Sequence, residues 1–205
     1  MFDKEKYSDV QKKIIVSASD LFVKKGLRGT TVRDIANASG TNVAMVNYYF
    51  KSKENLFNKI LDDAFQVLSE RIFTIIDSDL PFFDLVRKWV YSYYETLSEY
   101  PHLPIFVLSE LSHNPEKLKD TFKLQHPYQI YAHLAIRINE EEKKGTIRKI
   151  VIPDFFLNIV SLLIFPHASA PLVTQFLNFS QEDYQKMLFE HREYVADFII
   201  NAIKK

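Results

Sequence analysis

Side chains that can read the edges of DNA bases gather in a short segment of this chain, residues 41–48. Asparagine can bond adenine through two hydrogen bonds, and a valine methyl group can touch the methyl group of thymine. We select five candidates for base contacts: Thr41, Asn42, Val43, Asn47 and Tyr48. Aromatic and basic residues follow directly. This order is typical of the second helix of a helix-turn-helix, which enters the DNA major groove.

The element in front of this segment is predicted to be a helix over residues 9–25. Ser8 and Gln11 have the spacing of a capping box, in which the serine hydroxyl accepts from the backbone N–H three residues later. Gly26 follows the last helical residue and is expected to end the helix.

Two further short elements complete the motif. A weaker capping pattern begins at Thr31 and predicts a second helix there. Gly40 supplies a turn before a third helix over 43–49. Ser52 is expected to cap a fourth helix that extends to about residue 76.

The rest of the chain shows long helical patterns broken by prolines, without strand-like alternation or an internal repeat. We therefore predict an all-α fold with an N-terminal three-helix helix-turn-helix domain, residues 1–52, and a larger C-terminal helical domain, residues 53–205. The elements that we expect in the larger domain include helices over about 81–99, 153–165 and 181–203, and a turn over 166–171.

Composition restricts the class of protein. The chain has 205 residues and no cysteine, which excludes disulfides, thiol catalysis and zinc bound by cysteine. Residues 1–60 carry 11 lysines and arginines against 6 acidic residues, whereas residues 61–205 carry 15 against 20. A basic N-terminal part suits a polyanionic partner. The N-terminus has no apolar signal core, and the apolar stretch 155–165 is too short to span a bilayer, so we expect a cytoplasmic protein that does not insert into a membrane.

Residues 8–60 resemble the DNA-binding domain of the TetR (tetracycline-repressor-like) family of bacterial regulators. The resemblance rests on Ala18-x-x-Leu21-Phe22-x-x-x-Gly26, Thr30-Thr31-Val32-x-x-Ile35-Ala36, Ala38-Ser39-Gly40 and Tyr49-Phe50-x-x-Lys53-Glu54-x-Leu56. It covers about a quarter of the chain. The family usually has tyrosine where this chain has Asn47, and the sequence from Asn42 to Tyr48 is similar to a branch that carries asparagine there.

The resemblance implies which residues contact phosphate. Thr31, Ser52 and Lys53 stand where the family grips the DNA backbone, and Tyr49 resembles the family tyrosine that donates its hydroxyl to phosphate. Helix N-termini favour such contacts because they present free N–H groups. Simpler roles stay open: Thr31, Ser52 and Asn42 as helix caps, Lys53 as a solvated surface lysine, and Tyr49 as partly a packing residue.

In the family, the C-terminal region pairs with a second copy, which implies a homodimer on a palindromic double-stranded DNA operator. Residues 155–165 are apolar nearly all round, and the last helix offers an apolar stripe. The members of this stripe are Tyr184, Met187, Leu188, His191, Val195, Phe198 and Ile199. Two such helices from each subunit would form a four-helix interface. The alternative is that both helices belong to the core of the monomer.

The same family region usually encloses a pocket for a small-molecule effector. The middle of the chain is rich in aromatic residues accompanied by histidines and other polar side chains, and a mostly apolar cavity with a few polar groups suits such a ligand. We expect a hydrophobic or amphipathic effector and name five candidates for the pocket: Trp89, Tyr93, Phe106, Tyr128 and Phe156.

A possible metal motif, Glu110-Leu-Ser-His113, occurs once, whereas a di-metal carboxylate site needs two such pairs. His126 and His133 are seven residues apart and could share a helical face. The sequence offers no glycine-rich phosphate loop and no convincing catalytic triad. We therefore expect no metal, no cofactor and no enzymatic activity.

The leading hypothesis is a homodimeric, ligand-responsive transcriptional regulator, most simply a repressor that an effector releases from DNA. A second hypothesis is an α-helical small-molecule or metal-binding protein, with or without enzymatic activity, that does not act on DNA. A third is a regulator of the same family that is controlled by a protein partner.

Overall fold

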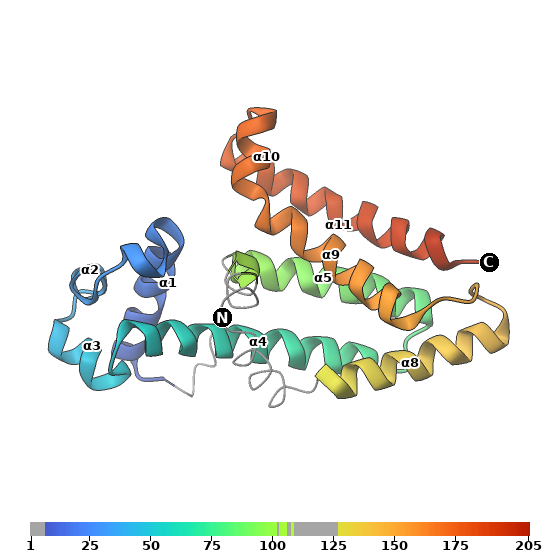
Figure 1. Cartoon of the computed structure of the whole chain (residues 1–205), viewed down its shortest axis with the longest axis horizontal. Helices are drawn as coiled ribbons and strands as arrows, with labels where there is room; N and C mark the ends of the chain where they lie inside the picture. The colour runs from blue at the N-terminus through green and yellow to red at the C-terminus, as the bar shows by residue number, and fades with distance from the viewer. Residues whose placement is uncertain (1–6, 102, 106–107, 109–126) are drawn as a thin grey trace. The chain divides into compact units, whose positions relative to one another are not determined.

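The computed structural model describes residues 7–101, 103–105, 108 and 127–205, which fold almost entirely into helices (Figure 1). The named helices are α1 (Asp9–Gly29), α2 (Val32–Ala38), α3 (Val43–Phe50), α4 (Lys53–Ile76), α5 (Phe82–Glu99), α8 (Pro127–Lys144), α9 (Ile152–Ala168), α10 (Ala170–Leu177) and α11 (Gln181–Ile203). The β-structure within the described ranges is one isolated antiparallel bridge between Ile147 and Lys204. The all-α prediction is confirmed.

The chain divides into two compact units, Met1–Gln66 and Val67–Lys205, and the division falls inside α4. The first half of α4 belongs to the first unit because it supplies core residues, among them Leu56 and Phe57. The ring of Phe57 meets that of Phe22 on α1 edge to face, with centroids 5.4 Å apart. Such a buried aromatic pair adds about 0.5–1.5 kcal/mol beyond the burial of its area.

The first helix follows its capping sequence but does not stop where the sequence suggested. The backbone N–H of Ser8 donates to the side chain of Gln11 at 3.0 Å, as a capping box requires. Gly26 adopts φ +69°, a conformation that glycine reaches without a Cβ clash, and so breaks the helix. Helical conformation then resumes and continues to Gly29.

The core of the second unit forms where α5 packs against α9 and α11. Trp89 and Leu97 on α5 are almost completely buried. Arg87, also on α5, joins α5 to α11 at the surface. Its guanidinium donates to Glu193 at 3.1 Å and to Asp197 at 2.5 Å, both on α11.

The apolar stripe expected on the last helix is divided between two faces. Tyr184, Leu188, Val195 and Ile199 are buried within the chain itself. Met187 and His191 are half-buried, and Phe198 is 54% exposed. For the four buried residues, the assignment to a dimer interface is therefore corrected: they pack inside the monomer, because α11 lies directly on α5.

The turn predicted over residues 166–171 is confirmed only at Ser169, where α9 and α10 meet at a bend of 60°. Helix α9 continues through Pro166 to Ala168, and α10 begins two residues later after Ser169. Proline removes one helical hydrogen bond but does not force the helix to end where packing holds it. The additional turn of α9 carries His167 into the core.

The described residues form helices of up to 24 residues. None of their helices is long and apolar enough to cross a membrane alone. Helices α9 and α10 reach the required length and composition only as a pair that is bent by 60°.

Candidate nucleic-acid interface

The turn between α2 and α3 is fixed by backbone and hydroxyl hydrogen bonds. Gly40 adopts φ +64°, which an L side chain would strain. The N–H of Thr41 donates to the carbonyl of Ala36 at 2.9 Å. The hydroxyl of Ser39 donates to the carbonyl of Ile35 at 2.7 Å and lies 2.8 Å from the hydroxyl of Thr41. These contacts set the direction in which α3 leaves the turn.

Helix α3 is anchored by one face and presents the other to solvent. Val46 and Phe50 are 1% and 7% exposed and hold the helix in the core of its unit. On the other side, Val43 is 38% exposed, Tyr48 is 74% exposed, and Asn47 is exposed as well. A helix that enters the major groove needs such an outward face of short polar and aromatic side chains.

Two of the base-contact candidates also have structural roles. Asn42 caps α3, since its side-chain oxygen accepts from the N–H of Met45 at 2.9 Å. Its amide N–H groups are not used in that bond, so capping and base contact are compatible. Thr41 is half-buried, and its hydroxyl already bonds Ser39.

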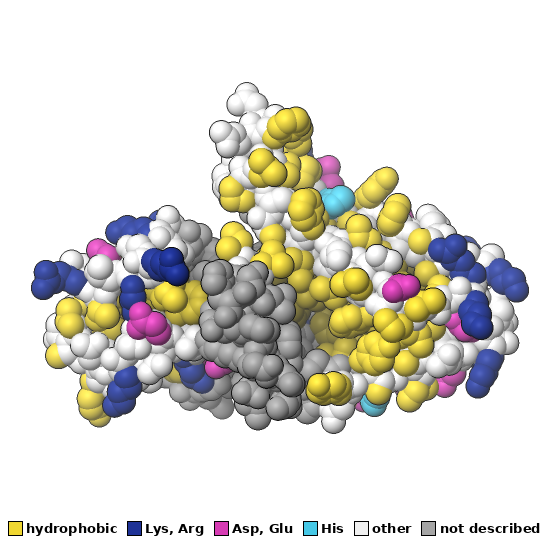
Figure 2. Space-filling model, viewed as in Figure 1, with side chains coloured by type: hydrophobic (Ala, Val, Ile, Leu, Met, Phe, Trp, Pro, Cys, Tyr) yellow, Lys and Arg dark blue, Asp and Glu magenta, His cyan; other side chains and the backbone are white. Residues whose placement is uncertain are grey.

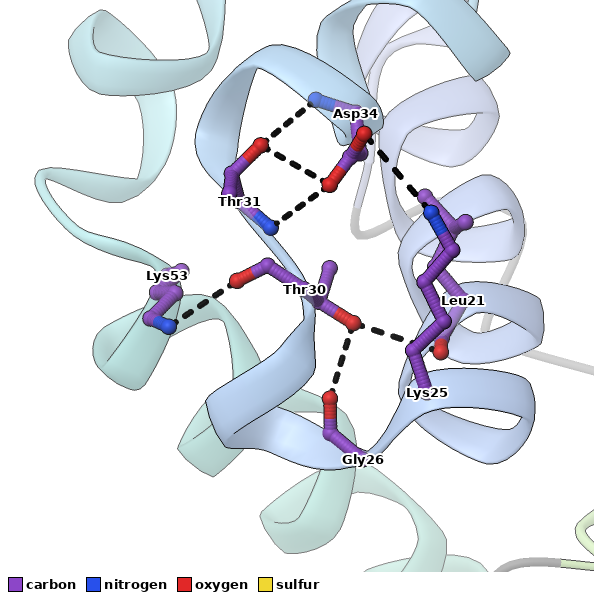
Figure 3. A network of polar contacts seen from close by, with 7 residues as sticks. All are labelled: Leu21, Lys25, Gly26, Thr30, Thr31, Asp34 and Lys53. Atoms are coloured by element: carbon purple, nitrogen blue, oxygen red, sulfur yellow. Dashed lines mark hydrogen bonds and ion pairs between the residues drawn. The ribbon is translucent and has the colours of Figure 1, made fainter.

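Thr31 caps α2 through a reciprocal capping box with Asp34 (Figure 3). The N–H of Asp34 donates to the threonine hydroxyl oxygen at 3.1 Å, and the N–H of Thr31 donates back to the carboxylate at 3.0 Å. The backbone hydrogen bond from Thr31 holds the pKa of Asp34 below its usual value. Lys25 on α1 approaches the same carboxylate at 3.7 Å.

Ser52 and Tyr49 lie around the start of α4. The hydroxyl of Ser52 accepts from the N–H of Asn55 at 3.1 Å and so caps this helix. Tyr49 is half-buried, and its ring meets that of Tyr48 edge to face with centroids 5.1 Å apart. Ser52 therefore acts as a helix cap and Tyr49 as a packing residue, which are the simpler roles that the sequence left open.

Lys53 is not the solvated surface lysine of the simpler interpretation. Its ammonium group donates to the carbonyl oxygens of Leu27 and Thr30, both at 2.9 Å (Figure 3 shows the bond to Thr30). These two bonds join the start of α4 to the segment before α2. An ammonium has three donors, so one remains for a phosphate, and the phosphate contact stays a prediction.

From the sequence we assigned no role to Thr30, which lies inside the hydrogen-bond network around Lys53. Thr30 is fully buried, and its hydroxyl donates to the carbonyl of Gly26 at 2.8 Å. We also did not select two exposed cations beside the motif, Arg33 on α2 and Lys51 after α3. Their position next to the capped helix starts was the available signal, because cations there are close to the expected phosphates.

The structure brings together only some of the pocket candidates. The rings of Trp89 and Phe156 lie 6.3 Å apart, and Tyr131 on α8 meets Phe156 edge to face at 6.1 Å. Burial raises the pKa of Tyr93 to about 12. Tyr128, in contrast, is 71% exposed. Phe106 lies outside the described residues.

A groove of about 590 Å³ runs between α9 and α11 and the segment that precedes α9. Its walls include Asn158 and Leu162 of α9 and Phe198 and Ala202 of α11. None of the four pocket candidates that the structure describes, Trp89, Tyr93, Tyr128 and Phe156, lines it. Figure 2 shows many apolar side chains on the surface of α9, α10 and α11.

The metal motif at Glu110 and His113 lies outside the described residues, as does His126. His133 pairs with Asp77 at 3.1 Å. Elsewhere in the described ranges, no group of three or more metal-ligating side chains comes together.

The capped α2, the glycine turn and the outward-facing α3 define a helix-turn-helix DNA-binding regulator. Residues 14–60 match the family model of bacterial regulatory proteins of the tetR family. Residues 14–60 are therefore a DNA-binding domain of the tetR type.

Known relatives agree with this assignment. The chain is 29% identical over 184 residues to the probable HTH-type transcriptional regulator YttP of Bacillus subtilis (strain 168), covering 87% of each chain. Over 65 residues it is 42% identical to the HTH-type transcriptional repressor KstR2 of Rhodococcus jostii (strain RHA1), which covers 30% of this chain and 32% of the relative.

Among solved structures, the ketosteroid transcriptional regulator KstR2 of Mycobacterium tuberculosis superimposes with a TM-score of 0.73 at 18% identity. The match covers 98% of this chain and 97% of that one. At this identity the likeness establishes the fold, which extends through both units.

Proposed function

We propose that this transcriptional regulator is a ligand-responsive repressor that binds a palindromic operator as a homodimer. The observation that carries the proposal is the orientation of α3. Val46 and Phe50 fix one side of the helix in the core, and Asn47 and Tyr48 stand out on the other. This arrangement presents hydrogen-bonding and apolar groups to a DNA groove without disturbing the fold.

We further propose a division of roles within residues 1–52 and the start of α4. Thr41, Asn42, Val43, Asn47 and Tyr48 face the bases. Thr31, Tyr49, Ser52 and Lys53 hold the phosphate backbone. Phosphate contacts position the protein on the DNA, and base contacts select the DNA sequence.

The homodimer is supported by apolar side chains on α9 and α11 that the monomer leaves uncovered. Leu157 and Phe165 on α9 are 64% and 67% exposed, and Phe198 on α11 is 54% exposed. Exposed apolar patches of this kind commonly mark association surfaces. A second copy related by a two-fold axis would cover the groove between α9 and α11 and would match a palindromic operator.

Effector control is proposed to act through α4, which is continuous from Lys53 to Ile76 and belongs to both units. In the second unit, Arg71 on α4 donates to the hydroxyl of Thr96 at 2.9 Å and pairs with Glu99 at 3.0 Å, both on α5. Helix α5 also carries Trp89. An amphipathic effector bound beside Trp89 would bias the position of α4 and so disfavour the DNA-binding state.

Selection of bound duplexes from a random DNA pool, at two salt concentrations, tests the DNA-binding function. A recovered palindrome whose affinity falls steeply with salt is expected, because phosphate contacts release counterions. Failure of the folded protein to bind any duplex at low salt would favour the second hypothesis, a helical binding protein that does not act on DNA.

A further inference from the structure

Among the buried polar atoms of the second unit that have no hydrogen-bond partner in the described residues, two belong to neighbouring rings. They are the hydroxyl of Tyr94 on α5 and Nε2 of His167 in the last turn of α9. Tyr94 is 3% exposed and His167 is 7% exposed. Their rings meet edge to face with centroids 4.9 Å apart. Buried polar atoms are almost always paired, so two unpaired ones side by side call for an explanation.

The neighbouring polar side chains are otherwise engaged. Tyr184 on α11 donates its hydroxyl to the carbonyl of Pro166. His191 is half-buried, and its ring stacks on that of Tyr194 at 6.1 Å while lying 6.4 Å from Tyr94. The unpaired groups are thus a hydroxyl and an imidazole nitrogen contributed by two different helices.

Buried leucines accompany these rings on each of the three helices. Leu97, Leu163 and Leu188 lie within about one turn of Tyr94, His167 and His191 on α5, α9 and α11, and each is buried. Burial and the nearby His191 also lower the pKa of His167 to about 4, so its ring is neutral at neutral pH. The environment therefore suits a molecule with an alkyl or ring body and a polar end.

We infer that Tyr94 and His167 form the polar end of the effector site and bind an oxygen head group, a hydroxyl, carbonyl or carboxyl, on an otherwise apolar molecule. The inference rests on the proposed ligand-responsive function. It adds residues that were not among the pocket candidates and assigns a chemical class to the effector.

The two groups favour an uncharged oxygen head group over an ammonium, because the site is buried and neutral. The hydroxyl of Tyr94 can donate to a ligand oxygen, and the neutral ring of His167 can bond the same head group through Nε2. An ammonium could donate to the Tyr94 hydroxyl oxygen or to an unprotonated Nε2, so hydrogen bonding alone does not exclude it. Burying its charge beside a neutral imidazole, however, is unfavourable.

The first test needs no ligand and compares Tyr94→Phe with Tyr184→Phe in thermal unfolding of the full chain. Tyr94→Phe removes a hydroxyl that has no partner among the residues that the structure describes, so its Tm should be equal to or above that of the wild type. Tyr184→Phe removes a hydroxyl bonded to Pro166, so its Tm should fall. An equal fall in both variants would overturn the inference, because the Tyr94 hydroxyl would then have a partner within the protein.

The second test measures binding of 1-octanol, octanoic acid, octylamine and octane to the wild type, Tyr94→Phe and His167→Phe. The wild type should prefer octanol or octanoic acid to octane and octylamine by about tenfold, the effect of about 1.4 kcal/mol. Both variants should lose this preference while still binding octane, and Tyr184→Phe should keep it. The stronger of the two oxygen probes identifies the head group.

An unchanged preference in both Tyr94→Phe and His167→Phe would overturn the inference but leave the effector-responsive function standing. If the wild type bound none of the four probes, the proposed class of effector would fail, and the inference with it. The DNA selection experiment would still test the operator-binding function independently.

Discussion

The ammonium group of Lys53 donates a hydrogen bond to the carbonyl oxygen of Thr30 at 2.9 Å, across 23 positions of sequence. The same group bonds the carbonyl of Leu27. The first turn of α4 is thereby joined to the segment that leads into α2, where Thr31 begins the helix-turn-helix. A lysine that we expected only at the surface facing DNA thus also stabilises the helix-turn-helix.

Replacement of Lys53 by methionine should lower the stability of the first unit. The variant loses two hydrogen bonds from a charged donor, worth about 1–3 kcal/mol together. Chemical unfolding in urea would measure this loss. DNA affinity should fall as well, and its dependence on salt should become shallower if the remaining donor reaches a phosphate.

Lys51→Met is the matched control, because Lys51 is exposed and follows α3 directly. Its free energy of unfolding should lie within about 0.5 kcal/mol of that of the wild type. Equal stability of Lys53→Met and the wild type would show that the two carbonyl bonds contribute nothing to folding.

Two substitutions in α3 should separate positioning from sequence reading. Tyr49→Phe removes one proposed phosphate contact and should weaken binding to all duplexes by a similar factor. Asn47→Ala should instead relax the preference at one base pair by about 1–3 kcal/mol. Binding assays on the selected operator and on single-base variants measure both effects. Parallel losses on every duplex for both variants would contradict the proposed division of roles.

Phe198→Asp should dissociate the proposed homodimer. Phe198 is exposed on α11 and lines the groove beside α9, so a buried carboxylate would be placed in the interface. Sedimentation equilibrium should show a monomer, and operator affinity should fall with it. Ile136→Asp on α8 is the control, since Ile136 is 56% exposed and lies outside that groove. A dimer that survives Phe198→Asp would place the interface elsewhere.

His167 should make the second unit sensitive to acid. Burial lowers its pKa to about 4 in the folded chain, against an ordinary value of 6.5. The unfolded chain therefore takes up the proton more readily between these values. The contribution of His167 to the free energy of unfolding should be fully present above pH 6.5 and should be lost as pH falls toward 4. Between pH 7 and pH 5 this contribution should fall by about 2 kcal/mol.

Comparison of His167→Phe with the wild type isolates this effect from the other titrating groups. The difference in unfolding free energy between pH 7 and pH 5 should be smaller in the variant by about that amount. His191, whose pKa burial also lowers, remains in both proteins, so the difference reports the loss of His167 together with its interaction with His191. Identical pH profiles would mean that His167 is solvated in the folded state.

The first unit could be predicted closely because its signals are local. Ser8, Thr31 and Ser52 cap their helices through bonds that span three residues, and Gly40 makes its turn alone. Such interactions depend on neighbouring sequence and can be recognised there. The outward face of α3 followed from the same short-range periodicity.

The sequence by itself determined most of the helices and the helix-turn-helix. Tertiary structure decided which partner each side chain found: Lys53 the carbonyl of Thr30, the stripe of Tyr184 and Leu188 the monomer core, and His167 the ring of Tyr94. Helical periodicity shows that a face is apolar but not what covers it, since a second copy and the chain's own α5 bury the same kind of surface. Contacts between residues far apart in sequence are fixed only when the helices pack.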